Sequence, residues 1–185
     1  PSKVAVAAGL AVSDAVSPLV EEPVWLKWPN DVELGARKVA GILSESIHAC
    51  GAQWTIVGIG INVDVDFAGG EGEVLQEEGV DAPAEELSVK ATSLSAYRRA
   101  GRGPIDREAL IATVADRLET RLSEEGLIEA WKARLSTIGR AVRIGAPTGV
   151  VEGTAVDVDN EGCLVVRDTN GRLRSFAAGD VTVVA

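Results

Sequence analysis

Two long runs of residues that favour extended backbone constrain the fold more than any other feature of this sequence. β-Branched residues dominate both 39–47 and 54–63, and the second run is apolar almost throughout. Such runs are typical of β-strands, and a continuously apolar run is typical of a strand that is covered on both faces. We therefore expect the two runs to form the centre of a sheet, with both faces of 54–63 buried.

Helical patterns lie on either side of this predicted sheet in the sequence. Apolar residues within 4–15 recur on one helical face. Asp106 is placed to cap a second helix, which we expect to end at Gly126, and a shorter helix over 127–135 would carry Trp131 inward. The stripe of the second helix that we expect to be buried consists of Leu110, Val114, Leu118 and Leu122.

The pattern changes after residue 137 to short strand segments separated by turns. The Asn-Gly pair at 170–171 predicts a hairpin, because both residue types tolerate a positive φ. Several short strands within so short a stretch are typical of a small barrel. We therefore expect two domains, 1–136 and 137–185. The predicted strands of the second domain span 141–144, 150–158, 163–167, 173–176 and 181–184.

Composition excludes several classes of protein. A formal charge of −10 and a pI near 4.6 argue against a nucleic-acid-binding surface, which needs a basic patch. Cys50 and Cys163 are far apart and lack CxxC spacing, so neither a disulfide framework nor a zinc site is indicated, and a cytoplasmic location fits best. We find no bilayer-spanning segment and no signal peptide.

One segment is strongly acidic. Between residues 64 and 87 the sequence carries nine Asp or Glu residues and no basic residue. A stretch of this composition cannot bury enough apolar surface to pack, so we expect an exposed loop. We assign it no function.

The densest cluster of candidate functional residues is Lys-Trp-Pro-Asn-Asp at 27–31, which follows a predicted strand at 24–28 and precedes Lys38 and Gly41. Lysine neutralises phosphate charge, and Asp and Asn oxygens suit a magnesium ion. The cluster therefore predicts a site for a nucleotide triphosphate, where the glycine would let a ligand or another backbone approach closely. The same pattern also fits a proline turn with ordinary solvated charges.

A second cluster is Gly-Ile-Gly-Ile-Asn-Val at 58–63. A dinucleotide-binding loop would need a third glycine and a following helix, so an oxidoreductase is a weak alternative. Glycines inside a strand more plausibly make room for a flat ligand, with Asn62 at the strand end facing the same site. Close packing of a helix onto the sheet would explain the glycines equally well.

Taken in order, these motifs resemble the biotin protein ligases. The resemblance is carried by the motifs at 27–31 and 58–63 together with Arg-Lys-Val-Ala-Gly-Ile-Leu at 37–43. It continues through Ala-Thr-Ser-Leu at 91–94 and Thr-Ile-Gly-Arg at 137–140. It covers essentially the whole chain except the acidic segment.

The resemblance implies both a fold and a reaction. The fold would be α+β, with a mixed-sheet, class II synthetase-like catalytic core over 1–136 and an SH3-like β-barrel over 137–185. The reaction would use ATP and Mg²⁺ to convert biotin to biotinyl-5′-AMP. The biotinyl group would then pass to a lysine of the biotin carboxyl carrier domain of acetyl-CoA carboxylase or a related carboxylase.

The resemblance also implies roles for individual residues. Lys38 would be the catalytic residue, because a positive charge at the biotin carboxyl and the adenylate phosphate stabilises the charge that develops there. The expected biotin site comprises Lys38, Gly41, Ile42 and Gly60, the expected ATP site comprises Lys27, Asn30 and Asn62, and the expected metal ligand is Asp31.

One departure from the family pattern is large. The glycine- and arginine-rich loop that closes over the adenylate, and the Ser/Thr segment that grips the ureido ring of biotin, would precede Pro1. We therefore expect an N-terminally truncated copy with little ligase activity by itself. A lipoate ligase and a non-catalytic protein that binds a carrier domain are the alternatives. Residues 44–53 could also form an exposed strand edge that pairs with a second copy, unless Glu45 and the serines prevent it.

Overall fold

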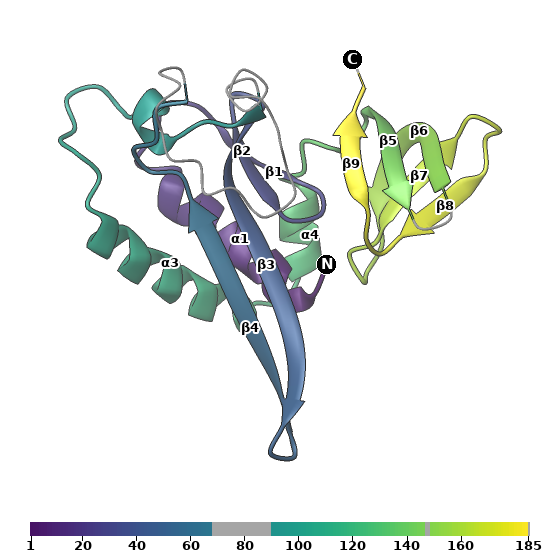
Figure 1. Cartoon of the computed structure of the whole chain (residues 1–185), viewed down its shortest axis with the longest axis horizontal. Helices are drawn as coiled ribbons and strands as arrows, with labels where there is room; N and C mark the ends of the chain where they lie inside the picture. Colours follow the sequence, from purple (N-terminus) through teal and green to yellow (C-terminus); the bar gives the residue numbers. More distant parts are fainter. Residues whose placement is uncertain (68–89, 147–148, 185) are drawn as a thin grey trace.

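The structure is a computed structural model, and it describes residues 1–67, 90–146 and 149–184. An α+β unit forms the first part of the chain, and an all-β unit follows it at the C-terminal end (Figure 1). No helix of the described residues is long and apolar enough to cross a membrane. Residues 68–87 of the acidic segment lie outside the described residues, so the loop expected there stays a prediction.

Four strands form the sheet of the first unit in the order β1-β2-β3-β4. All neighbouring strands run antiparallel, and parallel pairing is confined to the single bridges Leu26–Leu135 and Lys38–Ala91. The described sheet is therefore an antiparallel meander rather than the mixed sheet expected from the sequence, because short turns join its consecutive strands. The strands are β1 (Val24–Lys27), β2 (Asp31–Leu34), β3 (Arg37–Ala49) and β4 (Ala52–Ile61).

The position of β4 contradicts the prediction for the second β-branched run. β4 is the outermost strand of the sheet, and most of its side chains are half-buried or exposed, with Trp54 58% and Ile56 57% exposed. The β3–β4 hairpin extends well beyond the helices that pack on the sheet (Figure 1). An apolar run shows that a segment would be stabilised by burial, but not that another element of the described chain covers it.

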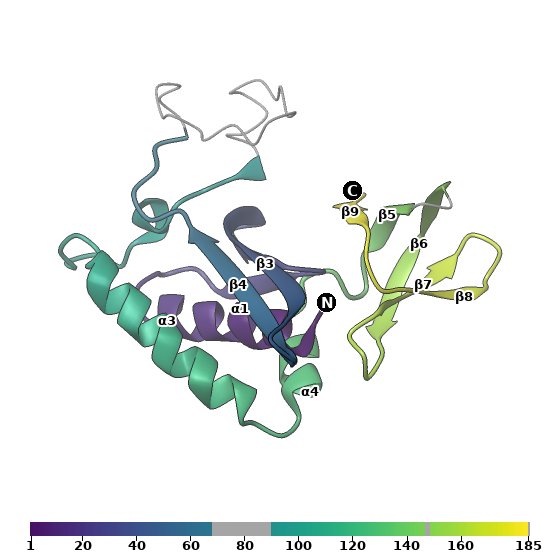
Figure 2. The ribbon, with the colours of Figure 1, turned by 60° about the horizontal axis from the view of Figure 1, so that its bottom comes forward.

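Helix α1 (Lys3–Val16) lies between the sheet and α3 (Arg107–Leu122), as Figure 2 shows. It is buried along nearly its whole length, so it supplies the largest part of the core of this unit. Asp14 on α1 binds Arg121 at 2.7 Å and Arg134 at 2.6 Å, which fastens the two later segments to it. Two shorter helical segments of the described residues are η1 (Leu94–Tyr97) and α4 (Leu127–Lys132).

Helix α3 begins where the sequence predicts and ends earlier. The Asp106 side chain accepts hydrogen bonds from the backbone N–H groups of Glu108 and Ala109, which confirms the predicted cap. The helix ends at Leu122, which is 39% exposed, so the predicted buried stripe does not reach it. Gly126 instead precedes α4 with a φ of 75°, a left-handed conformation that glycine adopts without strain.

The C-terminal unit contains the five strands that the sequence predicts, in the order β8-β7-β6-β5-β9. Neighbouring strands are antiparallel, and Val142, Ile144 and Leu164 are buried between them. Strands β8 and β9 stand at opposite ends of this order and do not pair within 149–184, so closure into a barrel is not observed there. The strands are β5 (Ala141–Ala146), β6 (Gly149–Val158), β7 (Leu164–Asp168), β8 (Leu173–Phe176) and β9 (Asp180–Val183).

Asp168 organises the β7–β8 hairpin. Its carboxylate accepts hydrogen bonds from the backbone N–H groups of Arg172 and Asn170, both at 2.9 Å, and from Nε of Arg174 at 3.0 Å. The bond from the backbone of Arg172 has the largest part in lowering the pKa of Asp168, and it outweighs the opposing effect of burial. The folded state therefore favours the ionised form of the Asp168 carboxyl group.

This arrangement predicts an acid-dependent loss of stability. Because the pKa of Asp168 is lower in the folded state, its stabilising effect is complete above the pKa of an unfolded aspartate, about 3.9, and disappears as the pH falls through the folded value. The Asp168→Asn variant should unfold more easily than wild type at pH 7, and this difference should shrink toward pH 3. Denaturant unfolding at both pH values measures it, with Asp116→Asn on the exposed surface of α3 as the control. A difference that does not change with pH would contradict the assignment.

Candidate functional site

A row of four residues crosses the sheet from edge to edge. The strand register places Lys27 of β1 opposite Asp31 of β2, Asp31 opposite Gly41 of β3, and Gly41 opposite Gly60 of β4. Directly opposed residues share one face of a sheet. Ile42, the neighbour of Gly41, faces the other side, where its side chain comes close to α1. The row therefore lies on the face of the sheet that points away from the helices.

Lys38 reaches over this row. Its Nζ lies 2.7 Å from Oδ1 of Asp31, and the two side chains are 49% and 20% exposed. A Cβ atom added to Gly41 would lie 3.0 Å from Cε of Lys38 and 3.1 Å from its Nζ. The absence of a side chain at Gly41 is thus what lets the lysine lie close to the strand and meet the aspartate.

The row opens toward free space at Gly60. A Cβ atom added there would meet no atom within 4 Å, whereas at Gly58 on the same face it would touch Leu43. Gly41 and Gly60 together make a patch of sheet without side chains beside the Lys38–Asp31 pair. A flat ligand could lie against such a patch.

The Lys38–Asp31 pair borders a large cleft between the sheet and the C-terminal unit, whereas Gly41 and Gly60 lie beside the pair and do not line this cleft. Its volume is about 880 Å³, and Lys27, Asp31 and Lys38 line it from the sheet. Ile138 and Arg140, with Val181 to Val183 on β9, line it from the C-terminal unit, and Leu135 lines it from a segment that bridges to β1. The sequence predicted the lysines and the aspartate but not the second wall, because no local pattern shows which loops a distant unit turns toward the sheet.

The two asparagines assigned to the nucleotide hold the backbone together in this structure. Nδ2 of Asn30 donates to the carbonyl of Ile42 at 2.7 Å, and Nδ2 of Asn62 donates to the carbonyl of Thr92 at 3.1 Å. The first bond joins the turn between β1 and β2 to β3, which carries Lys38, and the second joins the residue after β4 to the segment at Thr92. Each asparagine therefore lies next to the site, and its Nδ2 group is already hydrogen-bonded to the backbone. Neither asparagine lines the cleft.

Ile42 differs most from the expectation. Its side chain is 2% exposed and packs into the core on the α1 side of the sheet, opposite to Gly41 and Gly60. The structure therefore does not bring this side chain together with Lys38. Adjacent strand residues face opposite sides of a sheet, so the side chain of Ile42 cannot line a pocket on the face where Gly41 leaves space.

Trp28 connects the site to the C-terminal unit. Its side chain is 1% exposed, and its Nε1 donates to the carbonyl of Gly162 at 3.0 Å. Its backbone N–H donates to Oγ1 of the buried Thr137, also at 3.0 Å. A further ion pair, Lys132 with Asp157 at 2.5 Å, crosses the same junction. A tryptophan between charged residues was the only signal of this junction in the sequence.

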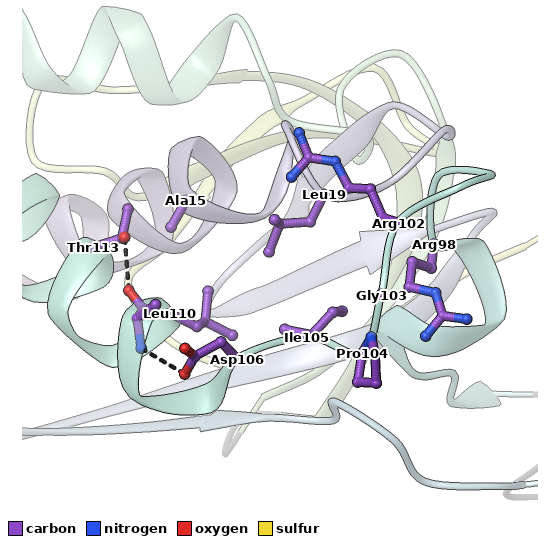
Figure 3. A pocket seen from close by; sticks show the side chains of 11 residues that line it. Ala15, Leu19, Arg98, Arg102, Gly103, Pro104, Ile105, Asp106, Leu110 and Thr113 are labelled. Carbon is purple, nitrogen blue, oxygen red and sulfur yellow. Dashed lines mark hydrogen bonds between the residues drawn. The ribbon is translucent and has the colours of Figure 1, made fainter.

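A separate cavity of about 350 Å³ lies between α1 and α3 (Figure 3). Leu19, Ile105 and Leu110 line it, and Arg98 and Arg102 come from the loop that follows η1. It contains no residue of the cross-strand row. We therefore place the candidate site in the cleft and not in this cavity.

The charges of the cleft limit how a metal ion could bind. Among the described residues no group of three His, Cys, Asp or Glu side chains is close enough to hold a metal. Asp31 is a single carboxylate, and it is paired with Lys38. Magnesium is often bound by one or two carboxylates together with substrate phosphates. The residues thus fit a magnesium ion that arrives with a nucleotide, rather than one held by the protein alone.

Comparison with solved structures identifies the fold. A structure of biotin protein ligase from Aquifex aeolicus without ligands superposes with a TM-score of 0.74 at 24% identity, covering 98% of this chain and 75% of that chain. The structure of biotin protein ligase from Aquifex aeolicus in complex with biotin and ATP has a TM-score of 0.71 at 26% identity, covering 98% and 71%. The architecture is that of the biotin protein ligases.

Sequence comparison leads to the same class. The family model described as "Biotin/lipoate A/B protein ligase family" matches residues 4–64, and that described as "Biotin protein ligase C terminal domain" matches residues 137–184. The biotin--[acetyl-CoA-carboxylase] ligase of Mycobacterium tuberculosis is 36% identical over 95% of this chain. The enzyme of the same name from Paracoccus denitrificans is 32% identical over 80% of it. The chain thus carries a segment of the biotin/lipoate A/B protein ligase family and a C-terminal domain of the biotin protein ligase type.

The chain spans only part of these relatives. It covers 60% of the length of the Mycobacterium tuberculosis protein and 58% of that from Paracoccus denitrificans. The two family models nevertheless include the residues described above. The model that matches 4–64 contains the whole cross-strand row, and the model that matches 137–184 contains Thr137 and Gly162.

The Trp28 junction predicts a measurable loss of stability. Trp28→Phe keeps an aromatic ring but removes the Nε1–H group, which leaves the buried carbonyl of Gly162 without its partner. We expect the free energy of unfolding to fall by about 1–3 kcal/mol, plus a smaller loss of packing. Trp25→Phe is the matched control, because Trp25 lies on β1, three residues before Trp28, but is 44% exposed. Equal effects of the two substitutions in denaturant unfolding would contradict the role of the indole.

Proposed function

We propose that this protein takes part in the ATP-dependent attachment of biotin to a carrier protein. The observation that carries the proposal is the Lys38–Asp31 pair, which lines a cleft of about 880 Å³ and lies beside a strip of sheet without side chains. The matches to the two family models, and the names of the two enzymes similar to it, support the same reaction.

The reaction has two steps. A carboxylate oxygen of biotin attacks the α-phosphorus of ATP, and the bond to pyrophosphate breaks, which leaves biotinyl-5′-AMP. The amine of a carrier lysine then attacks the acyl carbon, AMP leaves, and the amine loses a proton as the amide forms. Negative charge develops on the phosphate in the first step and on the acyl oxygen in the second. A fixed ammonium group next to both would lower each barrier.

We assign the residues as follows. Lys38 is the catalytic residue, and it binds the carboxyl of biotin and the adenylate phosphate. Gly41 and Gly60 leave room for the biotin ring, while Ile42 supports this surface only from the core side. Lys27 binds the phosphates of ATP. Asn30 and Asn62 lie beside them and hold the loops of the site in place.

Asp31 is the residue that would hold Mg²⁺. A magnesium ion bound there would neutralise the charge of the ATP phosphates. Because Asp31 is paired with Lys38 at 2.7 Å, the aspartate must exchange at least part of this contact for the metal. ATP would then bring the metal and the lysine into contact with the same phosphates.

The assignment of the chain to two domains is also a proposal. Residues 1–136 would form the catalytic domain and 137–185 a C-terminal domain of the SH3-like barrel type, whose β8 and β9 would approach each other to close it. The carrier would be the biotin carboxyl carrier domain of acetyl-CoA carboxylase or of a related carboxylase. The two free cysteines, Cys50 and Cys163, are consistent with a cytoplasmic location of the protein.

A lipoate ligase is the second candidate, because the family model that matches residues 4–64 includes lipoate ligases. The C-terminal match at 137–184 is to a model described as a biotin protein ligase domain, and it favours biotin. Supplying lipoate in place of biotin in the assay below distinguishes the two.

Replacement of Lys38 tests the proposed function. We expect the product of the gene that encodes this sequence to exchange labelled pyrophosphate into ATP only when biotin is present. Lys38→Ala should slow this exchange by roughly 100- to 1,000-fold, because it removes the charge that stabilises the transition state. Lys3→Ala, at the start of α1, is the control and should exchange normally. Exchange that is independent of biotin, or unchanged in Lys38→Ala, would refute the assignment.

Residues 44–53, the expected pairing edge, form the tip of the β3–β4 hairpin, and the free edge of the sheet there is that of β4. We propose that two copies pair through the outer edge of β4. β4 has no strand neighbour on that side among the described residues, and exposed β-edges readily pair with other strands. Ile56→Lys on β4 should then shift sedimentation at increasing concentration from dimer to monomer. Ile111→Lys, at a 70% exposed position on α3, should not. A wild-type protein that stays monomeric at every concentration, with and without biotin, would rule out the dimer.

A further inference from the structure

The wall of the cleft that faces the lysines contains one basic residue from the C-terminal unit. Lys27 and Lys38 line the cleft from the sheet, whereas Arg140 lines it from the segment just before β5. The other described lining residues of that unit, including Ile138 and Val181 to Val183, carry no charge. Basic residues of both units therefore line one cleft.

The backbone that carries Arg140 is held at several points. Its N–H donates to the carbonyl of Thr137 at 3.2 Å, and its carbonyl accepts from the N–H of Ala155 on β6 at 3.0 Å. Thr137 in turn accepts the hydrogen bond from the backbone N–H of Trp28, the residue next to Lys27. One chain of bonds thus fixes Arg140 and Lys27 relative to each other.

The local charge of the cleft differs from that of the chain. The protein as a whole has a formal charge of −10. Lys38 and Asp31 neutralise each other in the cleft, and Ser136 donates its hydroxyl proton to Glu33 at 2.9 Å. No hydrogen bond or ion pair of the Arg140 guanidinium is found within the described part of the chain, and this side chain is exposed. The charged residues that line the cleft are Glu22, Lys27, Asp31, Glu33, Lys38, Lys90 and Arg140.

We propose that Arg140 is a phosphate-binding residue that holds the triphosphate chain of ATP from the C-terminal side of the cleft, opposite Lys27. This inference rests on the proposed function, since it names a further residue for the same substrate. A guanidinium group matches phosphate oxygens with two parallel N–H donors and is always charged. Because the backbone of Arg140 is already held by hydrogen bonds, less conformational entropy is lost when the residue binds a phosphate. The C-terminal unit thereby contributes directly to nucleotide binding.

The test compares ligands that have and lack phosphates. Binding of Mg-ATP, inorganic pyrophosphate and adenosine is measured by calorimetry with the product of the gene that encodes this sequence. Arg140→Ala should weaken Mg-ATP and pyrophosphate by roughly 10- to 100-fold and leave adenosine unchanged. Arg140→Lys should be intermediate, since it keeps the charge but loses the planar pair of donors. Arg143→Ala is the control, because Arg143 is bound to Glu152 on the outer surface of β5 and β6.

Each other outcome overturns the inference. Equal affinities of wild type and Arg140→Ala for pyrophosphate would refute it while the proposed function stands. An equal loss of affinity for adenosine would assign Arg140 a purely structural role. A wild-type protein that binds neither Mg-ATP nor pyrophosphate would refute the proposed function together with this inference.

Discussion

The buried indole of Trp28 is the contact on which the arrangement of this molecule depends. It lies one residue after Lys27, at the end of β1, and its Nε1–H is bonded to Gly162 in the C-terminal unit. A buried donor that lost this acceptor would be costly, so the two units are held at one separation. That separation sets the width of the cleft. The residue with the clearest structural role thus lies inside the motif that contains the candidate binding residues.

Local patterns predicted the elements of the fold well. The helix start at Asp106 and the five strands after residue 137 follow from capping and turn chemistry, which act over a few residues. The exposure of β4 and the early end of α3 were missed. Both depend on which other elements lie nearby, and a hydrophobic pattern contains no information about a partner that is distant in the sequence.

The candidate site was predicted in its composition but not in its geometry. Lys27, Asp31, Gly41 and Gly60 were chosen from separate motifs, and strand register then brings them into one row. The prediction for Ile42 did not consider on which face of the sheet its side chain lies. Its motif neighbours were treated as one pocket, although alternate residues of a strand face opposite sides. The contribution of Arg140 to the cleft required the packing of the two units and could not be derived from any motif.

The exposed hairpin of β3 and β4 has a consequence for how the isolated chain behaves in solution. Leu43, Trp54 and Ile56 leave apolar surface next to an edge that can pair with another strand. Repulsion between molecules with a formal charge of −10 opposes association beyond the proposed pair, and this repulsion vanishes near a pH of 4.6. Mildly acidic buffers should therefore precipitate the chain while its fold is still intact, and an alkaline, low-salt buffer should keep it dissolved.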